Sequence, residues 1–226
     1  MNKKEIDILN VKEDIINEND ENAAAFRKEL TEKGVYLLNL MGSPGAGKTS
    51  TLLKTIEALK GDYRIGVMEA DVDSDVDAKT ISETGVKVIQ LHTGGSCHMD
   101  SAMTKQGVEG LGIEDLDVVI LENIGNLVCP AEFDVGAARK ATILSVPEGD
   151  DKPLKYPLMF QVTDVLLINK IDAMPVFDFS MDKLKDNLKN LNKDISIFPI
   201  SAATGEGVDE WTRWLKADIE TWRKNK

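Results

Sequence analysis

The most constraining feature of the sequence is a glycine-rich segment that directly follows an apolar run. Residues 42–49 read Gly-Ser-Pro-Gly-Ala-Gly-Lys-Thr, and residues 35–41 before them are mostly apolar. The segment is a full match to the pattern Gly-x-x-x-x-Gly-Lys-[Ser/Thr], in which backbone N–H groups of a strand-to-helix turn surround phosphate oxygens. A chance lysine in a glycine-rich turn is a poor alternative. The chain is therefore expected to bind a nucleoside triphosphate on an α/β fold.

The positions of this phosphate loop have separate expected roles. Lys48 is expected to reach the β- and γ-phosphates as a point charge, and the Thr49 hydroxyl is expected to coordinate Mg²⁺. The remaining nucleotide contacts are expected from the other loop residues, which are Gly42, Ser43, Gly45, Ala46, Gly47 and Ser50.

Six further apolar runs follow the phosphate loop along the chain. They lie at residues 65–68, 86–91, 118–121, 143–146, 165–168 and 195–200. Helix-length polar segments separate many of these runs, which is typical of parallel strands joined by crossover helices. Together with the run before the phosphate loop, they predict a doubly wound, mostly parallel α/β sheet of about seven strands flanked by helices.

The two ends of the chain carry helical patterns. Residues 1–33 are polar and helix-prone, and we interpret them as a helical N-terminal extension that is partly flexible. Residues 34–226 then form one nucleotide-binding domain, because 226 residues leave little room for two. Near the C-terminus, Trp211, Trp214 and Trp222 recur at helical spacing. This spacing predicts a helix packed on the core, with a partner-docking face as the alternative.

Charge and hydropathy exclude two classes of partner. The chain has 27 Lys and Arg against 39 Asp and Glu, and its net charge of −12 would repel a nucleic acid backbone. The apolar runs are far shorter than the roughly 20 residues of a membrane-spanning helix, and no charged-then-apolar signal segment opens the chain. We therefore expect a cytoplasmic protein that binds neither nucleic acid nor membrane.

A second nucleotide-binding motif follows the apolar run at 165–168. It reads Asn169-Lys170-Ile171-Asp172 and resembles the guanine-specificity motif of GTPases, in which the aspartate accepts two hydrogen bonds from guanine. Adenine offers no matching donors, so a buried Asp172 carboxylate would stay unsatisfied beside it. By itself the tetrapeptide could also be a solvated strand end. After the next strand, Ser201 and Ala202 are expected to direct backbone N–H groups toward the base oxygen.

Acidic residues after two other strands are expected to hold magnesium. The run at 118–121 ends in Glu122, and Gly125 is placed so that its N–H can meet the γ-phosphate. By resemblance to GTPases that dimerise on nucleotide binding, Asp71 belongs to the magnesium surroundings and Asp77 to a switch loop. The expected Mg²⁺ set is Thr49, Asp71, Asp77 and Glu122, and the expected catalytic set is Lys48, Thr49, Asp77 and Glu122.

The acidic cluster itself admits other interpretations. Asp71, Asp73, Asp75 and Asp77 alternate as in a calcium loop, but no glycine turn and no closing glutamate follow at the right distance. A calcium site is therefore rejected. Helix capping remains the alternative for Asp73 and Asp75.

A third group of residues suits a softer metal. Cys97 and His98 are adjacent, and Cys129 lies seven positions beyond Glu122. Thiolate and imidazole ligands suit Ni²⁺ or Zn²⁺, and three ligands leave a coordination position open for water, a partner chain or a second copy. Taken alone, such cysteines are better explained as buried small hydrophobes, and their position beside the expected switch elements is what favours a metal site. The only other histidine, His92, is assigned a structural role.

In combination, these motifs are similar to the HypB family, the nickel-insertion GTPases of hydrogenase maturation. The similarity extends over about residues 35–205 and is most specific in the string Glu-Asn-Ile-Gly-Asn-Leu-Val-Cys-Pro at 122–130. It implies a GTP-hydrolysing homodimer that forms on GTP or metal binding, with Ni²⁺ or Zn²⁺ at Cys97, His98 and Cys129. It also implies two partners, a HypA-like nickel metallochaperone and the [NiFe]-hydrogenase large-subunit precursor. Residues 1–33 lack Cys and His, so nickel storage at that end is not expected.

Two other functions are retained as alternatives. The urease accessory GTPases also carry a Cys and His pair, but a proline separates the two residues there, whereas Cys97 and His98 are contiguous. A non-catalytic scaffold that binds GTP as a structural ligand would instead use the tryptophan-bearing C-terminal helix to hold a partner. Release of phosphate in a single turnover distinguishes an enzyme from such a scaffold.

Overall fold

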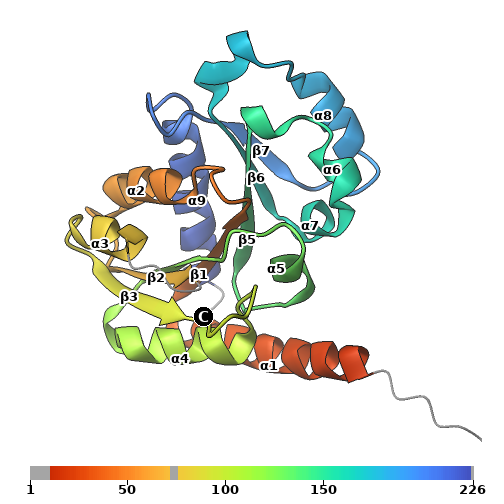
Figure 1. The fold of residues 1–226 in the computed structure, drawn as a ribbon. Helices are drawn as coiled ribbons and strands as arrows, with labels where there is room; N and C mark the ends of the chain where they lie inside the picture. Colours follow the sequence, from red (N-terminus) through yellow and green to blue (C-terminus); the bar gives the residue numbers. More distant parts are fainter. Residues whose placement is uncertain (1–10, 72–75, 225–226) are drawn as a thin grey trace, which may run out of the picture.

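The computed structural model describes residues 11–71 and 76–224, and its centre is a parallel sheet (Figure 1). The strands are β1 (Tyr36–Gly42), β2 (Ile65–Asp71), β3 (Lys87–His92), β4 (Val118–Glu122), β5 (Arg139–Ser145), β6 (Val165–Asn169) and β7 (Ser196–Pro199). Their order in the sheet is β3-β2-β4-β1-β5-β6-β7, and every neighbouring pair is parallel. The seven-stranded, doubly wound fold expected from the sequence is confirmed.

Helices cover both faces of this sheet (Figure 1). The α-helices are α1 (Val11–Lys33), α2 (Lys48–Leu59), α3 (Val76–Ser82), α4 (Ser101–Leu111), α5 (Cys129–Glu132), α6 (Lys152–Lys155), α7 (Pro157–Val162), α8 (Met181–Leu188) and α9 (Val208–Arg223). Short 3-10 helices are η1 (Ile113–Asp115), η2 (Val146–Glu148) and η3 (Ile171–Val176). Because all strands are parallel, their carboxyl ends and the loops that follow them share one edge, where ligands of such sheets bind.

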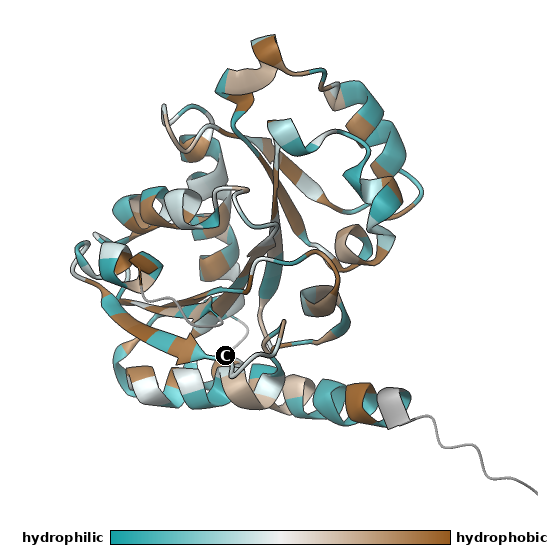
Figure 2. Cartoon of the chain, viewed as in Figure 1, coloured by the Kyte–Doolittle hydropathy of each residue, from teal (hydrophilic) through white to brown (hydrophobic). Residues whose placement is uncertain are grey.

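The core consists of three clusters divided by the sheet. Strands β1, β4 and β6 are buried on both faces and are almost uninterrupted apolar runs, whereas the helices carry both teal and brown segments in Figure 2. One cluster joins the sheet to α2 and α9, a second joins it to α1 and α4, and a third joins it to α5, α7 and α8. This packing fixes the loops at the carboxyl edge from both sides.

Strand β5 begins earlier than its apolar residues indicate. The expected run starts at residue 143, whereas the strand starts at Arg139. Two polar residues enter the strand because ion pairs accommodate them. Arg139 pairs with Asp218 at 2.9 Å, and Lys140 pairs with Asp134 at 3.4 Å. The C-terminal strand is shorter than expected, since only Ser196–Pro199 pairs with β6.

Core packing of the C-terminal helix is confirmed. Trp211, Leu215 and Ile219 on α9 are buried, and Trp211 Nε1 donates to Thr55 Oγ1 on α2 at 3.0 Å.

Our expectations for residues 1–10 and for Asp73 and Asp75 lie outside the described residues. Across residues 11–71 and 76–224, no helix combines the length and apolar character needed to cross a membrane.

Candidate nucleotide and metal sites

The phosphate loop joins β1 to α2 through glycines in the left-handed region. Gly45 and Gly47 have φ values of 74° and 96°, conformations that L side chains rarely adopt. A Cβ atom on Gly47 would also overlap Asn169 Nδ2. Lys48 Nζ lies 3.4 Å from the carbonyl oxygen of Ser43. The loop thus keeps an open turn in front of the first turn of α2.

A cavity of about 600 Å³ opens in front of this loop. Most of the predicted phosphate and magnesium residues line it, namely Gly45, Gly47, Lys48, Thr49, Ser50, Asp71, Asp77, Glu122, Gly125 and Lys170. Ala46, within the loop, is buried, and Ala202 lines a neighbouring cavity together with Ser50. The structure therefore gathers the residues of four separate sequence motifs at one edge of the sheet.

Asn169 connects the predicted guanine motif to the phosphate loop. Its buried side chain donates to the Ala46 carbonyl oxygen at 2.9 Å and accepts from the N–H groups of Lys170 and Ala202 at 2.8 and 3.1 Å. Lys170, with φ 63°, donates through Nζ to the Gly45 carbonyl oxygen at 2.7 Å. Asn169 and Lys170 thus organise the nucleotide loops by contacts within the protein.

The other two elements assigned to the base lie nearby. Asp172 is exposed at the start of η3, where its carboxylate faces solvent. Ser201 is buried, and its Oγ accepts from the Thr204 N–H at 3.1 Å, which stabilises the turn after β7.

Glu122 is a buried carboxylate beside the phosphate loop. Thr49 Oγ1 donates to Glu122 Oε1 at 2.8 Å, while Glu122 Oε2 has no hydrogen-bond partner among the described residues. Burial raises the pKa of Glu122 to about 7. An orphaned carboxylate oxygen next to a threonine hydroxyl, with Asp71 and Asp77 on the same cavity, fits a hard divalent cation such as Mg²⁺.

The two cysteines and His98 form a compact cluster. One ligand atom from each of Cys97, His98 and Cys129 lies within 4.8 Å of the others, and the two Sγ atoms are 2.7 Å apart. The His98 ring stacks on Phe133, with ring centroids 3.7 Å apart. Burial lowers the pKa of His98, which favours the neutral imidazole that binds metals. The donor set suits Ni²⁺ or Zn²⁺.

His92 lies apart from this arrangement. It is the last residue of β3, and the cluster of candidate ligands in the described part of the chain does not include it.

Sequence reasoning missed Asn126, which contacts both sites. Its backbone N–H donates to the Gly42 carbonyl oxygen of the phosphate loop at 3.1 Å, and its side-chain Nδ2 donates to the Cys97 carbonyl oxygen at 3.3 Å. Its Oδ1 accepts from the Val128 N–H at 2.8 Å. Its signal in the sequence was its place in the string at 122–130, between Gly125 and Cys129.

Glu69 was also missed. It is the β2 residue paired in register with Glu122 of β4, and only 3% of it is exposed. Its Oε2 has no hydrogen-bond partner among the residues described, and burial raises its pKa to about 7. A glutamate inside an apolar strand was the signal that could have identified it.

Comparison with known proteins agrees with this geometry. The family described as the CobW/HypB/UreG nucleotide-binding domain matches residues 36–199. The hydrogenase maturation factor HypB of Rhizobium leguminosarum bv. viciae is 44% identical over 92% of this chain and 70% of its own length. This chain belongs to the HypB family. Within that family, HypB of Escherichia coli strain K12 is 40% identical over 92% of the chain and 72% of its own length.

Solved structures of HypB share the fold over nearly the whole chain. Helicobacter pylori HypB, in complex with nickel, has a TM-score of 0.84 at 36% identity, covering 90% of this chain and 96% of its own. Archaeoglobus fulgidus HypB has a TM-score of 0.82 at 34% identity, covering 90% and 99%. The phosphate-loop fold of this family supports nucleotide hydrolysis.

Proposed function

We propose that this HypB-family chain is a GTP-hydrolysing metallochaperone that holds nickel at Cys97, His98 and Cys129 and delivers it during [NiFe]-hydrogenase maturation. The observation that carries the proposal is the contact of Asn126 with both the phosphate loop and the Cys97 loop. The three-ligand cluster and the nickel complex of the Helicobacter pylori relative support nickel as the cargo, with Zn²⁺ as a competing occupant.

GTP is the proposed substrate. Asp172 selects guanine through its carboxylate, and Lys48 with the backbone N–H groups of the loop binds the phosphates. Thr49, Asp71, Asp77 and Glu122 hold Mg²⁺, which when bound neutralises phosphate charge. No glutamine lines the described part of the cavity to orient a water molecule, so we expect slow intrinsic turnover.

Binding of GTP is proposed to draw Asp77 and the segment at 122–125 toward the γ-phosphate. Because α5 begins at Cys129, this movement shifts one thiol relative to Cys97 and His98. Two copies then close face to face and complete the open metal site, and hydrolysis changes the affinity for nickel. Such coupling requires the nucleotide to favour one of two arrangements of the ligands.

The expected partners follow from this cycle. A HypA-like metallochaperone exchanges nickel with the homodimer, and the hydrogenase large-subunit precursor receives it. The proposed setting is the cytoplasm, where the two thiols stay reduced.

The experiment measures Ni²⁺ affinity with GDP and with a non-hydrolysable GTP analogue, together with particle size. We expect affinities that differ by about 5-fold or more, and a dimer with the GTP analogue. Cys97→Ala and His98→Ala should abolish tight nickel binding, whereas the control His92→Ala should not. Equal affinities in the two nucleotide states would refute the coupling. Absence of phosphate release in a single turnover would favour a GTP-binding scaffold.

A further inference from the structure

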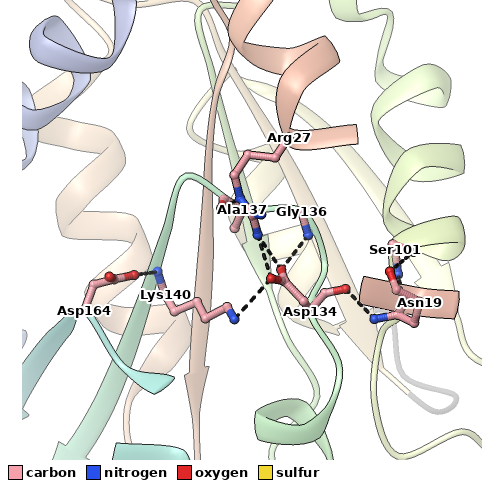
Figure 3. Close-up of polar contacts among 8 residues, drawn as sticks. All are labelled: Asn19, Arg27, Ser101, Asp134, Gly136, Ala137, Lys140 and Asp164. Carbon is pink, nitrogen blue, oxygen red and sulfur yellow. Dashed lines mark hydrogen bonds and ion pairs between the residues drawn. The ribbon is translucent and has the colours of Figure 1, made fainter. Parts of the chain in front are cut away.

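Helix α1 contacts both segments that carry the metal ligands. Asn19, on the face of α1 turned to the core, accepts from the Ser101 N–H through Oδ1 at 2.9 Å and donates through Nδ2 to the Asp134 carbonyl oxygen at 2.9 Å (Figure 3). Ser101 comes three residues after His98, and Asp134 comes five residues after Cys129. One buried amide therefore bridges the two halves of the metal cluster.

A second residue of α1 fixes the segment after Cys129. Arg27 Nη2 lies 2.7 Å from both carboxylate oxygens of Asp134, and Arg27 Nε donates to the Ala137 carbonyl oxygen at 2.7 Å (Figure 3). The same carboxylate accepts from the Gly136 N–H at 2.9 Å and pairs with Lys140 at 3.4 Å. The Asp134 carboxylate is thus held by three groups, which come from α1 (Arg27), from the segment before β5 (Gly136) and from β5 itself (Lys140).

Close packing reinforces these polar contacts. A Cβ atom on Gly136 would overlap the ring of Phe26 and approach the Ala23 carbonyl oxygen, so α1 lies directly against the backbone of this segment. On the side of the metal cluster, the only ring contact between the two segments in the described residues is the stack of His98 on Phe133. The spacing of the segments that carry Cys97 and Cys129 is therefore set by the contacts from α1 together with the bond of Asn126 to the Cys97 carbonyl oxygen.

We propose that α1 is a clamp on the metal site and that Asn19 is its positioning residue. The proposal rests on the proposed function only in taking nickel as the cargo. The clamp, formed by Asn19 and Arg27, sets the position of Cys97 and His98 relative to Cys129 without touching the metal. Groups that hydrogen-bond directly to metal ligands change metal affinity by about 10- to 100-fold when removed, and we expect the lower end of this range for Asn19, which holds the ligand segments through Ser101 and Asp134.

Asn19 suits this role because its hydrogen bond to Ser101 is buried and its hydrogen bond to Asp134 is partly buried. Only 7% of the residue is exposed, so its removal leaves the Ser101 N–H and the Asp134 carbonyl oxygen without their partner. The two segments can then separate to admit water. A displacement of about 1 Å between ligands is enough to weaken a site built on preorganised geometry.

The experiment compares Asn19→Ala with two control variants of the same helix. Glu29→Ala breaks the ion pair of α1 with Lys105 on α4, and Leu30→Val trims a fully buried side chain of α1. Asn19→Asp keeps an acceptor for Ser101 but cannot donate to Asp134. The readouts are Ni²⁺ affinity, the thiolate-to-nickel absorption band, and nucleotide affinity without metal.

A metal-free readout accompanies these measurements. Diamide, an oxidant that accepts two electrons and two protons, joins the Cys97 and Cys129 thiols into a disulfide. The rate of disulfide formation reports how often the two sulfur atoms come into contact. We expect Asn19→Ala and Asn19→Asp to weaken nickel binding about 10-fold or more. Asn19→Ala should also slow disulfide formation. Glu29→Ala and Leu30→Val should keep nickel affinities and disulfide-formation rates close to those of wild type.

The outcomes separate the clamp from the proposed function. If Asn19→Ala binds nickel as wild type does, or if Leu30→Val loses as much affinity at equal thermal stability, the clamp is refuted. If nickel affinity is independent of nucleotide but falls in Asn19→Ala, the coupling fails and the clamp stands. If the wild-type chain binds no nickel, the disulfide rates decide: slower oxidation in Asn19→Ala supports the clamp, and equal rates overturn it.

Discussion

Asn126 Nδ2 donates to the Cys97 carbonyl oxygen at 3.3 Å, while the Asn126 N–H donates to Gly42 at 3.1 Å. One residue is therefore bonded to the glycine-rich phosphate loop and to the loop that carries Cys97, a proposed metal ligand. Packing of Gly125 against Pro44 brings the same segment into contact with the phosphate loop, since a Cβ on Gly125 would lie 3.0 Å from Pro44. A movement of either loop must be transmitted to, or resisted by, Asn126.

Replacement of Asn126 should uncouple the two sites. Asn126→Asp keeps the acceptor for the Val128 N–H but loses the donor to Cys97, and Asn126→Ala loses both. In both variants we expect Ni²⁺ affinity to differ by less than about 2-fold between GDP and a GTP analogue, where wild type differs by about 5-fold or more. Nucleotide affinity without metal should remain close to wild type. Coupling of wild-type size in Asn126→Asp would show that the bond to Cys97 is not the connection.

Two glycines of the phosphate loop form a matched pair for a second prediction. Gly45 and Gly47 both have positive φ values, but only at Gly47 would a Cβ overlap another side chain, that of Asn169. Gly45→Ala should therefore weaken nucleotide binding by about 5-fold, the effect of roughly 1 kcal/mol of backbone strain. Gly47→Ala should weaken it by about 100-fold or more, because strain and steric overlap act together. Titration with a fluorescent GDP analogue tests both variants, and similar losses would contradict the role of Asn169.

Base selectivity provides a third prediction. Asp172 is exposed and free to accept from the two guanine donors, whereas the amide of Asn169 is occupied within the protein. Asp172→Ala should therefore lower GTP affinity by about 100-fold and leave ATP affinity unchanged, so that selectivity is lost. Asp178→Ala, an exposed aspartate a few residues further on, is the control and should retain selectivity. A selective Asp172→Ala protein would place base recognition elsewhere.

The strand pattern and the site motifs could be predicted because each is local. A phosphate loop needs its glycines and lysine at fixed spacing, and buried parallel strands are apolar on both faces. The roles of Asn19 and Asn126 could not be predicted, because each depends on contacts between segments far apart in the chain. Asn19 lies 82 positions from Ser101 and 115 from Asp134, and nothing in the polar residues around it distinguishes it from a surface asparagine.

The start of β5 could not be predicted for the same reason, since it also depends on contacts with distant segments. Arg139 and Lys140 interrupt the apolar pattern, and the ion pairs that place them in a strand come from Asp218 and Asp134. Ion-pair partners cannot be read from spacing alone, so the strand was expected to begin later. Glu69 is a different case, since a glutamate in the middle of an apolar strand is visible in the sequence and calls for a partner or a function.

The paired carboxyl groups of Glu69 and Glu122 predict how stability depends on pH. Burial raises both pKa values to about 7, from about 4.5 in the unfolded chain, so the folded state binds more protons than the unfolded state between these limits. In the absence of nucleotide and divalent metal, the contribution of these two groups to the free energy of unfolding should therefore be greatest below about pH 4.5. This contribution should be lost as pH rises through 7. Because adjacent like charges titrate together, the two values belong to the pair.

Glu69→Gln removes one of these ionisable groups and should flatten the decline. At pH 8 we expect the variant to be more stable than wild type by roughly 1–3 kcal/mol, because no buried charge forms at position 69, and at pH 5 the two should agree within about 0.5 kcal/mol. Urea unfolding in the presence of EDTA measures the free energy of unfolding at both pH values. The titration of groups common to the two proteins, such as His98, cancels in the difference between them. Glu57→Gln on the exposed face of α2 is the control and should run parallel to wild type. If the Glu69→Gln curve also runs parallel to wild type from pH 5 to 8, burial does not raise the pKa of Glu69 and its carboxyl is ionised at neutral pH.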